Sequence, residues 1–173
     1  LELNFLADMF IRAVIREELL MEMLRNGIDV DIFGHGWEKF VEKCGNVEKS
    51  EGIFKGKINI CGEVDYRQLP ELYADTKIAL NVLPWFKAGQ HDRIALAMCN
   101  GCVCVTDEST YLEKKFVDGE NIFMYSLEDM TGAAMLVRDL LAHPLEAARA
   151  AAKGYVCAVS SLSFKKYIEI FIN

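Results

Sequence analysis

The sequence has no uninterrupted apolar run that approaches the length of a membrane span, although 52% of its 173 residues are hydrophobic. Its N-terminal stretch, LELNFLADMFIRAVIREELLMEML, carries charges at helical spacing and is predicted to form an amphipathic helix. Basic charge is also scarce, because 19 Lys and Arg stand against 26 Asp and Glu and give a net charge of -7. A nucleic-acid groove needs a basic face, so we expect no nucleic-acid partner, although a local basic pocket is compatible with this balance.

Clusters of metal ligands are scarce too. Cys99 and Cys102 have the C-x-x-C spacing of zinc and redox sites, but neither a second such pair nor a histidine pair supplies further ligands. Cys102 and Cys104 also fall in the pattern of a buried strand, where a free thiol behaves as a small apolar side chain. We therefore expect no metal and reduced thiols, which fits a cytoplasmic protein. The cysteines are Cys44, Cys61, Cys99, Cys102, Cys104 and Cys157.

The chain lacks internal repeats, low-complexity segments and an interdomain linker. Its length suffices for one domain with a substantial core, so residues 1–173 are predicted to form a single domain. The sequence begins at Leu1 inside a predicted helix and ends on EIFIN without a tail. From this we expect the chain to be a fragment of a longer, two-domain protein.

Strand and helix patterns alternate five times along the chain. The strands are short, apolar and rich in β-branched residues, which is typical of parallel strands joined by helical crossovers. The sequence therefore predicts an α/β fold with a doubly wound, Rossmann-like parallel sheet of five strands and extra helices at both ends. The predicted strands are 28–34, 57–62, 77–84, 102–107 and 118–125. The predicted helices are 2–26, 35–45, 65–75, 91–100, 109–116, 126–143, 145–153 and 164–172, and residues 45–57 are expected to be a loop.

Ligands of such sheets bind at the carboxyl ends of the strands. The loops at that edge are 34–37, 62–66, 84–93 and 106–109, and they hold both tryptophans and two of the three histidines. The loops at the opposite edge carry few residues of a kind that binds ligands. Asp29-Val30-Asp31 spells a DxD motif that can hold a divalent cation, but it opens a strand at that opposite edge and is interpreted as incidental.

The segment AGQHDR predicts a phosphate site. A helix that begins near His91 presents unpaired N–H groups and a partial positive charge in its first turn. Gly89 lets the backbone approach an anion, and Arg93 adds a permanent cation whose fork suits phosphate oxygens. Asp92 offsets some of this charge and could cap the helix or orient Arg93. The alternative is that Asp92 and Arg93 form an ordinary surface ion pair.

His35 lies between Gly34 and Gly36 after the first predicted strand, where it could donate to a phosphate or a sugar hydroxyl. The alternative is a turn histidine without a task. The pair of glycines lacks the third glycine of a dinucleotide fingerprint, and no acidic residue is clearly placed to hold a ribose. A hydride-transfer cofactor is therefore disfavoured, and we expect no cofactor.

Four segments in this order resemble the C-terminal, donor-binding half of GT-B glycosyltransferases, within the group 1 families and nearest to the group of the spore maturation protein CgeB. They are IFGHGW, GEVDYRQLPELYADTKIALNV, GQHDRIALAMCNGCVCVTD and FVDGENIFMY, and together they cover about residues 30–125. The family pattern is G-x-G-W, then V-x-x-x-x-L-P-x-x-Y, then G-x-x-x-R-x-x-E-A-M-x-x-G before a strand that ends in T-D.

The resemblance implies a transferase that moves a sugar from a nucleotide diphosphate to an acceptor. An N-terminal domain of the same protein would hold the acceptor, so the isolated chain is expected to be inactive, and the fold usually needs no metal. The implied donor site has Gly34, His35, Gly36 and Arg93 at the diphosphate, Val64 to Tyr66 near the base, and Thr106 and Asp107 on the sugar side. Gly89 and His91 join it through the predicted phosphate site at the helix start. No catalytic residue is assigned.

Leu96 departs from the family pattern. It stands where the resemblance implies an acidic residue that holds the ribose hydroxyls, and a leucine cannot accept those hydrogen bonds. This leaves open a non-catalytic binding or assembly module that retains the fold. A third reading, a nucleotide-using enzyme such as a sugar epimerase, is disfavoured by the missing dinucleotide fingerprint.

Overall fold

Parallel strands alternate with helices in the computed structural model of the chain, which describes residues 2–162. The predicted α/β class with parallel, Rossmann-like architecture is confirmed. The described residues fall into two compact units. The first runs from residue 2 to Tyr66 and includes Glu128–Arg138, and the second holds Arg67–Leu127 and continues from Asp139. The prediction of a single domain stays a prediction. The helix expected at 164–172, with Ser163 as its cap, lies outside the described residues.

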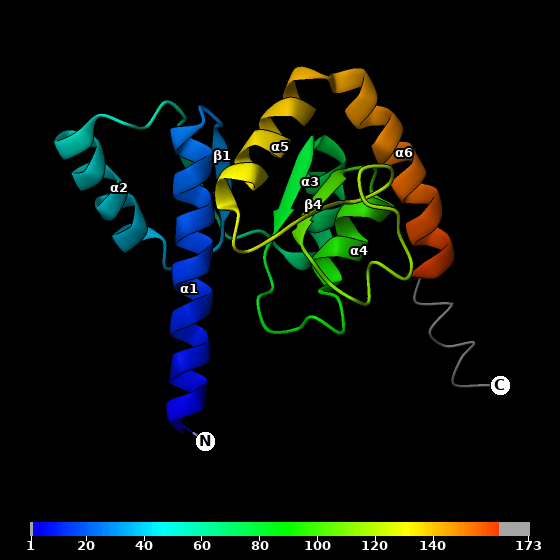
Figure 1. Cartoon of the computed structure of the whole chain (residues 1–173), viewed down its shortest axis with the longest axis horizontal. Coiled ribbons are helices and arrows are strands. Elements are labelled where there is room, and N and C mark those ends of the chain that lie inside the picture. The colour runs from blue at the N-terminus through cyan, green and yellow to red at the C-terminus, as the bar shows by residue number, and fades with distance from the viewer. Residues whose placement is uncertain (1, 163–173) are drawn as a thin grey trace. The chain divides into compact units, whose positions relative to one another are not determined.

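The first unit contains α1, α2, most of α5 (Met130–Ala142) and a two-stranded sheet (Figure 1). Helix α1 (Glu2–Arg25) ends at Asn26 and Gly27, as predicted, because Gly27 adopts a φ of 78° and its amide donates to the Leu24 carbonyl at 3.1 Å. Strand β1 (Val30–Phe33) pairs in parallel with β2 (Ile58–Gly62), and α2 (Glu38–Glu51) follows β1. The core of the first unit is formed by side chains of α1, β1 and α2, namely Met21, Leu24, Ile32, Phe40 and Cys44.

The second unit contains a parallel sheet in the order β3-β4-β5, formed by Ile78–Asn81, Val103–Asp107 and Phe123–Tyr125. Every residue of β4 is buried, as expected of a central strand. A 3-10 turn, η1 (Tyr66–Gln68), leads into α3 (Leu69–Asp75), and α4 (Asp92–Cys99) packs against α3 and against α6 (Pro144–Ser161) (Figure 1). The core includes Ile94, Met98, Cys104, Leu112, Phe116, Ile122, Ala158 and Leu162.

Several predicted boundaries are wrong. Residues 45–51 are not a loop, because α2 continues through them to Glu51. Residues 109–116 form hydrogen-bonded turns rather than a helix, with the Glu113 amide on the Ser109 carbonyl and the Phe116 amide on the Leu112 carbonyl. Helix α6 does not end at residue 153, as predicted, but continues to Ser161.

The helix predicted from Ser126 begins later, as α5 (Met130–Ala142). Asp129, not Ser126, supplies the oxygen for its start, because Asp129 Oδ1 accepts a 2.8 Å hydrogen bond from the Gly132 amide. Among the helices of residues 2–162, none combines the length and the apolar character needed to cross a membrane.

Candidate functional site

The loops that follow β1 and β2 meet at one edge of the first unit. Phe33 pairs with Gly62, and the Gly34 amide donates to the Gly62 carbonyl at 2.7 Å. Gly34 and Gly36 have φ angles of 109° and 84°, which only glycine adopts easily, and they turn the chain sharply around His35. His35 Nε2 lies 2.6 Å from Glu63 Oε1. The structure therefore brings the predicted residues 34–36 beside the loop that leads to Val64, which is half-buried, and to Tyr66, which is exposed.

The DxD aspartates have structural partners in the same unit. Asp29 Oδ1 accepts a hydrogen bond from the Lys57 amide at 2.7 Å, and Asp31 Oδ1 accepts one from Asn59 Nδ2 at 2.8 Å. Both carboxylates thus tie β1 to β2, in agreement with the incidental reading of the motif.

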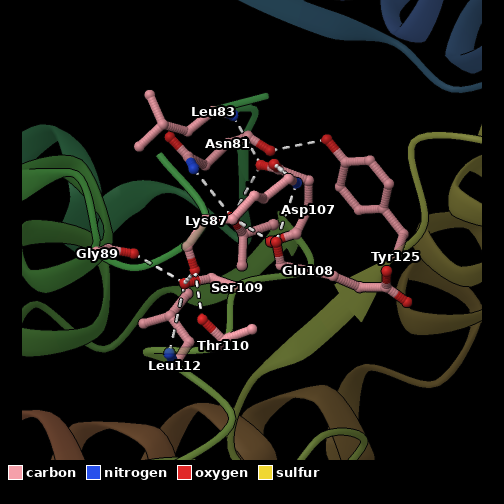
Figure 2. A network of polar contacts seen from close by, with 11 residues as sticks. Asn81, Leu83, Lys87, Gly89, Asp107, Glu108, Ser109, Thr110, Leu112 and Tyr125 are labelled. Atoms are coloured by element: carbon pink, nitrogen blue, oxygen red, sulfur yellow. Dashed lines mark hydrogen bonds and ion pairs between the residues drawn. The ribbon is translucent and has the colours of Figure 1, made fainter. Parts of the chain in front are cut away.

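Asp107 is the centre of a polar network in the second unit (Figure 2). The residue is 3% exposed at the carboxyl end of β4. Its Oδ1 accepts from the Leu83 amide at 2.7 Å, and its Oδ2 pairs with Lys87 Nζ at 2.5 Å. Lys87 Nζ also donates to the Glu108 carbonyl at 3.0 Å. Both carboxylate oxygens of this predicted sugar-side residue are therefore engaged by the segment between β3 and α4.

Ser109 and Thr110 bind the same segment through its backbone carbonyls. Ser109 Oγ lies 3.1 Å from the Lys87 carbonyl and 2.8 Å from the Gly89 carbonyl (Figure 2). The amide and the hydroxyl of Thr110 both donate to the Lys87 carbonyl at 2.9 Å. The loop 84–90 is thus fixed at several points although it has no regular secondary structure.

Asn81 and Thr106 are buried side by side at the ends of β3 and β4. Asn81 is 5% exposed, and its Nδ2 donates to Thr106 Oγ1 at 2.9 Å. The Tyr125 hydroxyl donates to the Asn81 carbonyl at 2.8 Å, and burial raises the pKa of Tyr125 well above its ordinary value, which keeps the hydroxyl protonated. Asn81 Oδ1 is buried and has no hydrogen-bond partner among the described residues.

A small hollow of about 10 Å³, enough for about one water molecule, lies at this edge, with Asn81, Thr106, Asp107 and Ser109 among its polar lining. Phe86, Gly89, Ile94 and Leu112 also line it. The Phe86 ring occupies the space beside Gly89, so a Cβ at this position would clash with Phe86 Cε1. The approach of an anion to the Gly89 backbone stays a prediction.

The start of α4 carries His91 as its N-cap residue. The Arg93 amide donates to Asp92 Oδ1 at 2.9 Å and has a longer contact with His91 Nδ1 at 3.3 Å. His91 Nδ1 also contacts Asp92 Oδ1. The prediction that the first-turn amides are unpaired is therefore wrong for the amide of Arg93, which is satisfied within its own turn.

Two nitrogen atoms of the Arg93 guanidinium have no such partner. These atoms, Nε and Nη2, are buried and make no hydrogen bond within residues 2–162. Asp92 pairs with His91, so the surface ion pair considered for Asp92 and Arg93 is not the arrangement found. Arg93 lies near Tyr73 of α3, where burial raises the pKa of the tyrosine and the positive charge of Arg93 opposes that rise. Two buried donors on a cation are costly without an acceptor, and an anionic ligand would satisfy both.

The predicted site residues divide between the two units. Residues 34–36, Val64 and Tyr66 lie in the first unit, whereas Gly89, His91, Arg93, Thr106 and Asp107 lie in the second. Convergence of Arg93 on residues 34–36 joins the units and stays a prediction. Sequence reasoning missed Asn81 and Lys87. Asn81 could have been found, because it is a polar residue inside an apolar strand, whereas no feature of the sequence pattern points to Lys87.

The cysteines are free thiols throughout. Burial raises the pKa of Cys102 to about 12 and raises the pKa of Cys104 further, whereas Cys61 is exposed. Within residues 2–162, no group of three or more His, Cys, Asp or Glu side chains is placed to hold a metal ion.

Several solved structures are similar to this chain. HepE from Anabaena, solved with UDP-glucose, has a TM-score of 0.63 and 16% identity over 83% of this chain and 40% of its own. TarM from S. aureus, solved with fondaparinux, alpha-GlcNAc-glycerol and UDP, has a TM-score of 0.71 and 16% identity over 90% and 32%. The C-terminal domain of LpcC, a group 1 family glycosyl transferase from Francisella tularensis, has a TM-score of 0.58 and 20% identity over 74% and 65%.

At these identities the likeness establishes the fold, which is that of the Rossmann-like domains of GT-B glycosyltransferases. The chain spans only 40% of HepE and 32% of TarM. Among curated proteins, none matches the chain. The model of the glycosyl transferase-like family matches residues 12–171, and the chain therefore belongs to that family. Membership of the CgeB group stays a prediction.

Proposed function

We propose that the chain is the C-terminal, donor-binding half of a glycosyltransferase and that it holds a nucleoside diphosphate sugar. The observation that carries this proposal is the guanidinium of Arg93, whose Nε and Nη2 are buried without a hydrogen-bond partner among the described residues. A diphosphate offers oxygens in the spacing that an arginine fork recognises. UDP is the first nucleotide to test, because HepE and TarM were solved with UDP or a UDP-sugar.

The reaction transfers a glycosyl group. The bond between the anomeric carbon and the diphosphate oxygen breaks, and the acceptor oxygen forms a new bond to that carbon. The nucleoside diphosphate leaves with the bonding electron pair, so negative charge grows on its oxygens. Arg93, beside which the diphosphate would lie, stabilises this charge electrostatically. The family resemblance further assigns residues 34–36 to the diphosphate and Val64 to Tyr66 to the base.

The rest of the machinery would come from an N-terminal acceptor domain of the same protein. That domain would bind the acceptor and supply the group that takes its proton, so the chain alone would be inactive. The proposed enzyme works in the cytoplasm and needs neither a metal nor a further cofactor.

Calorimetric titration of the full-length protein with UDP-glucose tests the proposal. We expect Arg93→Gln to weaken binding about 10- to 100-fold, because hydrogen bonds between charged groups are lost. Arg149→Gln in α6 is the matched control, since Arg149 is exposed and far along the chain from the loops, and it should bind like the parent protein. No binding of UDP, GDP or their sugars at millimolar concentration to folded protein would overturn the proposal.

Leu96 favours a second candidate, a binding or assembly module without catalysis. Leu96 is half-buried on α4, three residues after Arg93. Leu96→Glu separates the candidates: a retained ribose site should gain nucleotide affinity, whereas a site that has lost this function should only lose stability, because a half-buried carboxylate is costly. Leu145→Glu, at a leucine that is 75% exposed, controls for the added charge.

A further inference from the structure

We propose that the open edge of β1 is a docking site for the chain's own N-terminal segment, residues 2–7, which unwinds from α1 and pairs with β1 as a parallel strand. The docked strand would complete the sheet of the first unit, whatever ligand the protein binds. Three observations support it: the free edge of β1, the poor burial of the start of α1, and the strand-like sequence of that start.

One edge of β1 has no partner within residues 2–162, because β1 pairs with β2 alone in a two-stranded sheet. The amides of Val30 and Gly34 donate to carbonyls on the β2 side, at 2.9 Å and 2.7 Å. Since backbone groups alternate between the two edges of a parallel strand, the N–H and C=O groups of Asp31 and Phe33 point to the open edge. Such a row of unpaired groups can bind a further strand.

The first half of α1 is poorly buried. The helix has 24 residues and is roughly 36 Å long, whereas the four residues of β1 span about 13 Å. Its C-terminal half packs in the core of the first unit, but its N-terminal half extends beyond β1 and α2 (Figure 1). Four large apolar side chains are 56% to 70% exposed there, namely Phe5, Leu6, Met9 and Phe10. Because helices in proteins owe most of their stability to packing, these first turns are marginal.

The sequence of the segment favours a strand. Apolar and polar residues alternate over LELNF, residues 1–5, which is the period of a strand and would place Phe5 on the apolar face. The helical charge spacing begins later, at Asp8, whose carboxylate pairs with Arg12 at 2.9 Å. Aspartate is a favoured N-cap residue, so a shorter α1 can begin at Asp8 and keep this ion pair.

Chain order selects the edge of β1 as the destination. A strand followed by α1 and then by β1 is a β-α-β unit, and the helix of that unit already packs on β1. In doubly wound sheets the first three strands lie in the order 3-2-1. β1 and β2 take the second and third places, so residues 2–7 take the first, on the open side of β1. The carboxyl end of the docked strand would lie at the edge that carries residues 34–36.

Hydrogen exchange of the full-length protein, resolved to single amides, tests this docking. The amides of Asp31 and Phe33 should exchange at least about 100-fold more slowly than unpaired edge amides. Phe5→Ala should remove much of this protection and lower the urea midpoint by about 1 M, because the ring is buried only when the segment is docked. Phe10→Ala is the matched control, since its ring is as exposed in α1 and lies beyond the proposed strand, and it should change neither quantity.

The other outcomes contradict the docking. Free exchange of both edge amides in the parent protein would overturn it, and so would equal effects of Phe5→Ala and Phe10→Ala. Protection that Phe5→Ala leaves intact would assign the edge of β1 to another segment of the protein. Protection that weakens on dilution would assign the edge to a second copy of the chain. Because Phe5 is 62% exposed in α1, its variant is expected to fold even when docking fails.

Discussion

At the scale of the residue, the buried carboxylate of Asp107 joins β4 to the segment that follows β3. Asp107→Ala would leave the buried Leu83 amide without an acceptor and Lys87 without its counter-ion. We expect this change to lower the free energy of unfolding by about 2–4 kcal/mol, measured by urea denaturation. Lys87→Met should lower it by less than Asp107→Ala does, because the carboxylate, which is 2% exposed, loses its counter-ion but keeps the hydrogen bond from the Leu83 amide. Equal losses in the two variants would contradict this account.

Thr106 and Asp107 also mark a limit of sequence reasoning. The strand ending in T-D correctly predicted two polar residues at the carboxyl edge of the sheet. It could not indicate that both side chains are taken by Asn81, Leu83 and Lys87, because those partners come from a segment about twenty residues earlier whose path no local pattern fixes. A polar residue at a strand end thus predicts the location of a site better than it predicts contact with the ligand.

At the scale of the element, α2 offers a direct test of a corrected boundary. Gly45 lies inside this helix with nothing within 4 Å of its missing Cβ, whereas Gly52 ends the helix with a φ of 60°. Gly45→Ala should therefore raise the free energy of unfolding by about 0.5–1 kcal/mol, and Gly52→Ala should lower it by about 1 kcal/mol. Thermal unfolding followed by circular dichroism measures both. A loss of stability in Gly45→Ala would mean that residues 45–51 are not helical.

The same helix explains why its second half was missed. Residues 45–51 are polar and begin with a glycine, so neither periodicity nor propensity indicates a helix there. The first half buries Phe40 and Cys44 in the core, and a helix nucleated in that way can extend at low cost into a polar segment. Tertiary packing, which a local pattern does not contain, therefore set the end of α2 at Glu51.

At the scale of the whole molecule, buried acids should limit stability at high pH. Burial raises the pKa of Cys102 from 9.0 to about 12, and it also raises the pKa of Cys104 and of Tyr125. Above about pH 9 the unfolded chain loses these protons while the folded chain keeps them. The stability that these groups contribute is therefore fully present below pH 9, and it is lost as the pH rises towards 12. We expect urea midpoints, measured with reductant, to fall between pH 8.5 and pH 10.5, and less steeply in Cys102→Ala. A constant midpoint would contradict this reading.

Topology made the edge of the site predictable, because the carboxyl ends of parallel strands share one side of a sheet. The contact between His35 and Glu63 follows from the pairing of β1 with β2 alone. The meeting of residues 34–36 with Arg93 has no such local basis, since it depends on the two units acting as one body. The single domain that the sequence predicts is therefore the assumption on which the complete donor site rests.

The two tryptophans can test that assumption, because each reports on a different unit. Trp37 packs edge-on against Phe40 in the first unit, with ring centroids 5.7 Å apart, and Trp85 lies in the second unit. In Trp85→Phe the fluorescence follows the first unit, and in Trp37→Phe it follows the second. A single cooperative domain requires both variants to unfold at the urea midpoint that circular dichroism gives for the same protein. We expect coincidence, because helix α5 contributes residues to both units and neither can lose it alone. Two separated transitions would mean that the donor site has to be assembled from independently folding parts.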